Sequence, residues 1–91
     1  MYLFLGQETV VKKGDIIGVF DLDRASTSPL TKQFLTGAQK HGRIVDVSPG
    51  ELPTSFVVCE RGGNTWVYLT QISPGTLKKR ADDNGQSTMD N

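Results

Sequence analysis

The sequence of 91 residues lacks most of the side chains from which enzyme and metal sites are built. It has a single cysteine, Cys59, and a single histidine, His41. One cysteine excludes an internal disulfide, which agrees with a reducing compartment, and nothing in the spacing gives His41 a partner for acid–base or nucleophilic work. Asp21 and Asp23 follow an expected strand without a third oxygen donor for a cation. We therefore predict no enzyme, no catalytic residue, no metal site and no cofactor, and we expect Cys59 to be buried in a strand.

Long apolar runs are also missing. Runs such as residues 16–20 and 56–59 fall far short of the ~20 residues that a membrane-spanning helix needs. The N-terminus reads Met-Tyr-Leu-Phe-Leu-Gly, without the basic start and the small-residue cleavage site of a secretory signal. We expect a cytoplasmic protein that has neither a membrane nor a small-molecule substrate among its partners.

The chain has no net charge, yet its charges are unevenly distributed. It holds ten Lys and Arg residues against ten Asp and Glu residues, and three of these acids follow residue 81. Residues 1–80 therefore carry ten bases and seven acids and are mildly basic. Residues 82–91 are polar and acidic with almost no apolar side chains, which predicts a disordered tail after a single domain that spans residues 1–81.

Alternation and turn chemistry predict a small α+β domain, in which an antiparallel β-sheet packs with one main helix and a short C-terminal helix. Gly62 and Gly63 allow the positive φ of a tight hairpin turn between two of the strands. Gly18 interrupts another strand and indicates a bulge or the close approach of a second backbone. The aromatic side chains lie mostly in strands and are expected to pack in the core. Strands are expected over residues 2–5, 9–11, 16–20, 43–47, 55–60 and 65–72.

Two serine–proline pairs mark helix starts, because a serine hydroxyl caps the first turn and proline suits the first helical position. After Ser28, apolar residues recur on one face and predict a helix over residues 29–41. Gly42 is expected to end this helix in a left-handed conformation, and Gly37 inside it favours close packing against another element. The serine–proline pair at residues 73–74 predicts a short helix over residues 76–81. Residues 23–27, which precede the first pair, are polar and predict a loop.

Positive charge is concentrated in two places. Lys78, Lys79 and Arg80 end the short C-terminal helix, and Lys12 and Lys13 lie in a turn. Both positions have an ordinary explanation, since bases stabilise the negative end of a helix and lysines keep turns soluble. Both also offer cations to the phosphates of duplex DNA. The two interpretations stay open, and these five bases are the candidate nucleic-acid-binding residues.

A chain this short buries a small core, so a partner subunit adds stability. Residues 2–5 are all apolar, so both faces of this strand require burial, either at a central position in a sheet or against another subunit. The apolar face of the main helix is a second surface of this kind. We predict a homo-oligomer, and the candidate interface residues are Tyr2, Leu3, Phe4, Leu5, Phe34 and Leu35.

Segments along the whole chain resemble the family of extracellular matrix regulators RemA and RemB, and the RemB branch in particular. These segments are the N-terminal Met-Tyr-Leu-Phe-Leu-Gly, residues 15–21 (Asp-Ile-Ile-Gly-Val-Phe-Asp), residues 55–58 (Ser-Phe-Val-Val) and residues 67–80. The last segment ends in Thr-Leu-Lys-Lys-Arg and is the most specific. The resemblance covers residues 1–81.

The resemblance implies a bacterial regulatory protein with a small α+β fold that assembles into ring-like homo-oligomers. For the RemA type it also implies DNA binding that activates biofilm-matrix genes, and hence duplex DNA as a partner. This chain departs from that type, because Glu51-Leu52-Pro53-Thr54 stands where the RemA type is arginine-rich, and Asp15 stands where it tends to be basic. The alternative function is therefore an oligomeric scaffold that binds another protein and does not contact DNA.

Overall fold

The computed structural model describes residues 1–82, and their order of elements confirms the predicted α+β class. The strands form a two-stranded antiparallel sheet and a four-stranded sheet in the order β3–β5–β6–β4. Apart from Asp82, the predicted tail lies outside the described residues. The strands are β1 (Tyr2–Gly6), β2 (Thr9–Lys12), β3 (Ile16–Asp21), β4 (Ile44–Asp46), β5 (Ser55–Arg61) and β6 (Asn64–Thr70).

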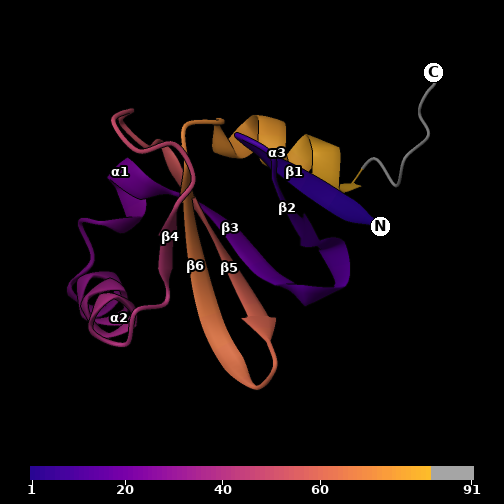
Figure 1. Cartoon of the computed structure of the whole chain (residues 1–91). Coiled ribbons are helices and arrows are strands. Elements are labelled where there is room, and N and C mark those ends of the chain that lie inside the picture. Colours follow the sequence, from indigo (N-terminus) through magenta and orange to yellow (C-terminus); the bar gives the residue numbers. More distant parts are fainter. Residues whose placement is uncertain (83–91) are drawn as a thin grey trace.

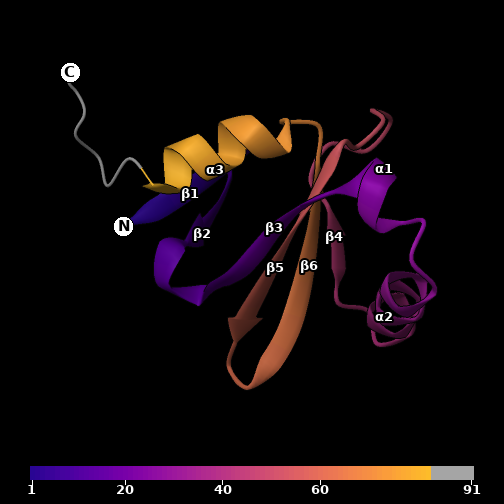
Figure 2. The same cartoon turned by 180° about the vertical axis from the view of Figure 1, so that it is seen from behind.

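The helices lie at two ends of the molecule, as Figures 1 and 2 show from opposite sides. α3 lies beside the β1–β2 hairpin at one end, and α1 and α2 lie at the other end. A short 3-10 turn, η1, connects the hairpin to the four-stranded sheet. The helical elements are η1 (Lys13–Asp15), α1 (Leu22–Ala25), α2 (Pro29–Lys40) and α3 (Pro74–Asp82).

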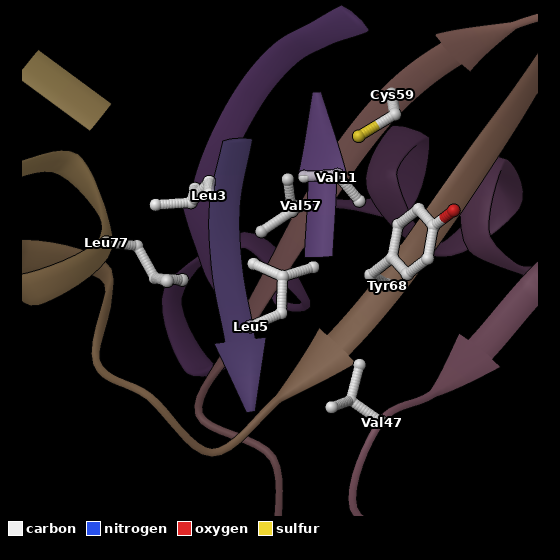
Figure 3. Close-up of a cluster of buried hydrophobic side chains, with 8 residues drawn as sticks. All are labelled: Leu3, Leu5, Val11, Val47, Val57, Cys59, Tyr68 and Leu77. Atoms are coloured by element: carbon white, nitrogen blue, oxygen red, sulfur yellow. The ribbon is translucent and has the colours of Figure 1, made fainter. Parts of the chain in front are cut away.

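Alternation along β5 and β6 divides the core between the two faces of the four-stranded sheet. Successive side chains of a strand point to opposite faces, so these two central strands supply both halves of the core. One cluster lies against the β1–β2 hairpin and α3 and contains Leu3, Leu5, Val11, Val47, Val57, Cys59, Tyr68 and Leu77 (Figure 3). The other cluster consists of Phe56, Val58 and Val67, packed with side chains of α1 and α2 such as Leu22 and Leu35.

The hairpin predicted around Gly62 and Gly63 is confirmed, with φ values of 60° and 82° at the two glycines. The strand predicted over residues 43–47 is shorter, as β4, and it pairs parallel with β6. The sheet is therefore mixed, because the loop after β4 carries the chain past β6 before β5 begins. Turn residues signal neighbouring antiparallel strands, whereas this crossing leaves no local signal in the sequence.

The predictions made for Gly18, inside a strand, and Gly37, inside a helix, differ in how they compare with the structure. At Gly18 the predicted bulge is confirmed, because the register between β3 and β5 shifts there. A Cβ at this position would come within 2.6 Å of the Phe20 ring, so glycine lets the ring lie against the backbone. The close packing predicted at Gly37 is wrong for the described chain, where a Cβ at this position would meet nothing within 4 Å.

Hydroxyl and carboxyl side chains begin the helices. The loop predicted over residues 23–27 is wrong in its first part, because α1 forms there with Asp21 as its cap. The Asp21 carboxylate accepts hydrogen bonds from the backbone N–H groups of Asp23 and Arg24, at 3.0 and 3.2 Å. The predicted start of α2 is confirmed, since Ser28 Oγ accepts a hydrogen bond from the third residue of the helix at 3.4 Å. Gly42 follows α2 with φ of 69°, in the predicted left-handed conformation.

A buried hydroxyl joins the two sheets. Thr70 is 1% exposed, and its Oγ1 donates a hydrogen bond to the Leu5 carbonyl at 2.7 Å and accepts one from the Ile72 N–H at 3.2 Å. Its cross-strand partner Ser55 is fully buried and donates a hydrogen bond to the Ile72 carbonyl. These bonds attach β1 to the four-stranded sheet and fix the path of the chain from β6 towards α3.

The substitution Thr70→Val tests this attachment, because valine keeps the shape of the side chain and removes both hydrogen bonds. The Leu5 carbonyl and the Ile72 N–H are then left without this partner, which costs about 1–3 kcal/mol for each buried group. We expect urea unfolding to show a loss of about 2 kcal/mol or more in the free energy of unfolding. Thr36→Val, on the exposed surface of α2, is the matched control, and an equal loss in both variants would contradict the role of Thr70.

The predicted burial of Cys59 is confirmed, since this strand residue is 2% exposed. Burial raises the pKa of the Cys59 thiol from 9.0 to about 11. The Asp15 carboxylate adds to this increase, and the Arg61 guanidinium opposes it. The thiol therefore stays protonated in the folded protein at pH values where it ionises in the unfolded chain.

This pKa difference predicts a loss of stability at high pH. Because the folded pKa is raised, the contribution of Cys59 is fully present below pH 9.0 and is lost as the pH rises through about 11. The loss amounts to about 2 kcal/mol in the free energy of unfolding. Urea unfolding of the protein and of its Cys59→Ala variant between these pH values measures it. We expect the difference between the two proteins to shrink as the pH rises, and parallel profiles would refute the raised pKa.

Candidate nucleic-acid interface

The fold brings the two predicted basic segments together. Lys12 ends β2 and Lys13 begins η1, while the three other candidate bases lie in the last turns of α3. The ammonium group of Lys13 donates a hydrogen bond to the backbone carbonyl of Arg80 at 3.1 Å. Residues 67 positions apart in the sequence are thereby joined, and Figures 1 and 2 show the β1–β2 hairpin beside the C-terminal end of α3. We call Lys12, Lys13, Lys78, Lys79 and Arg80 the basic cluster.

One buried leucine and one serine position α3 for this contact. Leu77 is fully buried against the β1–β2 hairpin and β5, and it fixes which side of the helix faces the core. Ser73 Oγ accepts a hydrogen bond from the Thr76 N–H at 3.2 Å and caps the first turn, so the helix begins at Pro74, two residues before the prediction. With Leu77 inside, the bases that follow it are exposed to solvent.

The basic cluster combines a structural contact with free charge. Lys13 is partly buried, and its ammonium group lies at the negative end of the α3 dipole, which accounts for this lysine without a ligand. Lys12, Lys78, Lys79 and Arg80 are exposed. These four exposed cations come from two segments that the Lys13–Arg80 hydrogen bond joins, and exposed Lys and Arg side chains are the groups that contact a phosphate backbone.

The two acidic residues that stand in contrast to the expected basic pattern, Glu51 and Asp15, lie in different places. Glu51 belongs to the loop between β4 and β5, where its N–H donates to the Ser48 carbonyl at 3.0 Å. Figures 1 and 2 place this loop beside α1, away from the C-terminal end of α3. Asp15, in contrast, lines a cavity together with Lys12 and Arg61. Only the second acid is therefore next to the basic cluster.

The four predicted interface residues of the first strand point alternately to its two faces, and only one of these faces is buried. Leu3 and Leu5 are 2% and 0% exposed and belong to the core of the chain itself, so the fold already provides the burial that the sequence required of them. Tyr2 and Phe4 point to the other face and are 62% and 48% exposed. An uninterrupted apolar run hides this two-residue period, which appears once α3 covers one face of β1.

The main helix has an apolar surface that extends beyond the predicted residues. Phe34 is 40% exposed, whereas Leu35 packs against the buried cluster beneath α2. Phe34 and Leu30 line a groove of about 290 Å³ with Ile17 and Phe20 of β3. The prediction that the aromatic side chains pack in the core is wrong for four of them. Phe20 and Phe34 are exposed, and so are Tyr2 and Phe4 of β1. The sequence hid the part played by β3, because that strand reads as a continuous apolar run.

The remaining candidate side chains have structural partners. His41 Nδ1 lies 2.8 Å from the Gly37 carbonyl, at the C-terminal end of α2. Asp21 caps α1, as described above. Within residues 1–82, no group of three or more His, Cys, Asp or Glu side chains is placed to hold a metal ion. Among the helices of this same part of the chain, none has the length and apolarity to cross a membrane.

Comparison with known proteins agrees with the resemblance seen in the sequence. Residues 3–81 match the family described as RemA-like, extracellular matrix regulatory protein A-like. Over 81 residues the chain is 40% identical to extracellular matrix regulatory protein B of Bacillus subtilis (strain 168), and this match covers 89% of the chain and 90% of the relative. The family match includes the strands β2 to β6 in full, and β1 and α3 except for one residue each. The chain therefore belongs to the RemA-like family of extracellular matrix regulators.

Proposed function

We propose that this chain is a bacterial cytoplasmic regulator that assembles into a homo-oligomer and binds duplex DNA to control transcription, without catalysing a reaction. The family supports the regulatory role. DNA contact is supported by the hydrogen bond between Lys13 and the Arg80 carbonyl, because this bond gathers the bases of two segments into one cluster. Phosphates of duplex DNA are the partner that such a cluster recognises without base-specific groups.

Two exposed apolar surfaces support assembly from copies of the same chain. The groove between α2 and β3 includes Leu30, which is 77% exposed, and Ile17, which is 60% exposed. Tyr2 and Phe4 form a second surface, on β1. Figures 1 and 2 show α2 and β1 at opposite ends of the molecule, so one surface of each copy is able to meet the other surface of the next. Head-to-tail contacts of this kind form a ring when the rotation from one copy to the next closes, and a filament when it does not.

The loop between β4 and β5 favours a second candidate function, that of an oligomeric scaffold for another protein. Leu52 in this loop is 88% exposed and follows Glu51 directly. An exposed leucine beside an acidic side chain suits a protein partner and repels a phosphate backbone. A scaffold of this kind does not need the basic cluster, so titration of a DNA duplex with the protein distinguishes the two functions.

The DNA proposal predicts that Lys78→Ala combined with Lys79→Ala weakens binding. Fluorescence anisotropy with a labelled duplex at several salt concentrations measures it. We expect the Kd at low salt to rise at least about tenfold, because the variant loses two phosphate contacts. Each lost contact also makes the slope of log K against log salt less steep by about 0.9.

The matched control removes the same charge from the other end of the molecule. Lys32→Ala combined with Lys40→Ala changes two exposed lysines of α2 and is expected to leave the affinity unchanged. An equal effect of both double variants would show a contribution of net charge alone and contradict a local site. If the unmodified protein does not bind the duplex at low salt, direct DNA recognition is wrong and the scaffold function remains.

The assembly proposal predicts that Phe34→Glu lowers the mass of the particle in solution, because it places a charge in the apolar groove. Light scattering measures this mass, and circular dichroism checks that the subunit is folded. Gln33→Glu adds the same charge at the neighbouring exposed position of α2 and is expected to leave the mass unchanged. A Phe34→Glu variant with the mass of the unmodified protein would exclude the groove as the subunit interface.

A further inference from the structure

A cavity of about 250 Å³ opens beside β2 and η1, next to the hairpin end of β5. Val11, Cys59 and Tyr68, all buried, form part of its lining. Lys12, Asp15 and Arg61 line it as well, so charges of both signs meet apolar side chains in one cavity that is partly open to solvent.

Side-chain hydrogen bonds of the described chain leave the three charged groups of this cavity without a partner. None of the side-chain hydrogen bonds within residues 1–82 involves Lys12, Asp15 or Arg61. Arg61 is held in place by the Trp66 ring, whose centre lies 4.7 Å from the guanidinium carbon. Asp15 is partly buried at the end of η1. An acid and a base are thus positioned in one cavity and stay available to a ligand.

The acid and the base act on the same region of the cavity. The carboxylate of Asp15 raises the pKa of Cys59 and the guanidinium of Arg61 lowers it, so both charges lie near the buried sulfur. Lys12 stands opposite Tyr2 in the β1–β2 register and supplies a second cation to the lining of the cavity.

We propose that this cavity binds a small zwitterion, namely an α-amino acid with an apolar side chain. The ligand's ammonium group pairs with Asp15, its carboxylate pairs with Arg61 and Lys12, and its side chain lies against the apolar lining. The volume is below the ~300–1,000 Å³ of pockets that hold drug-sized molecules, which suits a ligand of this size. A ligand with a single charge pairs either with Asp15 or with the two bases, and it leaves the other charged side chains of the cavity without a partner. This site binds a ligand without converting it, and it does not depend on contact with DNA.

Titration calorimetry with the full chain tests the proposal, with L-leucine, L-methionine and L-phenylalanine as probes. We expect at least one of these amino acids to bind. 3-Phenylpropanoate lacks the ammonium group of phenylalanine, and phenethylamine lacks its carboxylate. We expect both analogues to bind at least about tenfold more weakly than the amino acid that binds best. Asp15→Asn is expected to raise the Kd of that amino acid at least about tenfold and to leave 3-phenylpropanoate unaffected. Arg61→Gln is expected to raise the same Kd and to leave phenethylamine unaffected.

Matched controls change the same charges outside the cavity. Glu60→Gln and Arg24→Gln alter exposed residues that do not line it and are expected to leave all affinities unchanged. The proposal is overturned if none of the three amino acids binds at about 10 mM. It is equally overturned if Asp15→Asn and Glu60→Gln have the same effect on the amino acid, because the acid of the cavity then makes no specific contact.

Discussion

The buried hydroxyl of Thr70 is the contact on which the placement of both sites depends. Apolar packing holds β1 and α3 against the four-stranded sheet, but it is non-directional and does not select one orientation. The hydrogen bonds of Thr70 to Leu5 and Ile72 supply that direction. They place the β1–β2 hairpin beside α3, where Lys13 reaches the Arg80 carbonyl. A polar contact in the interior thus decides which charges meet at the surface.

Features of the fold that rest on local chemistry could be predicted from the sequence. The Gly62-Gly63 turn, the Ser28 cap and the bulge at Gly18 each follow from the conformational range of one or two residues. The parallel pairing of β4 with β6 could not be predicted, because it depends on where a loop crosses the sheet. The one-turn helix α1 was missed for a related reason, since an aspartate at a strand end serves equally well as a loop residue or a cap.

The candidate sites show the same division between local and tertiary information. Each half of the basic cluster was visible in the sequence, but only the fold joins Lys13 to the end of α3. The sequence indicates that both faces of the first strand require burial, yet the described chain covers only Leu3 and Leu5 and leaves Tyr2 and Phe4 exposed. The charged cavity could not be predicted, because Arg61 is far along the sequence from Lys12 and Asp15 and only the fold brings the three charges together.

A mildly basic subunit limits how the proposed DNA contact can work. Residues 1–80 carry ten bases against seven acids, and Asp15 lies in the cavity wall beside Lys12. Since each phosphate contact adds only about one unit to the salt dependence of binding, a single copy of the cluster binds a duplex weakly. An oligomer presents the cluster repeatedly, and the raised effective concentration strengthens binding without further bases in the subunit. In the proposed regulator the apolar groove is therefore as necessary for DNA binding as the bases, because it sets how many clusters meet the duplex and how far apart they lie.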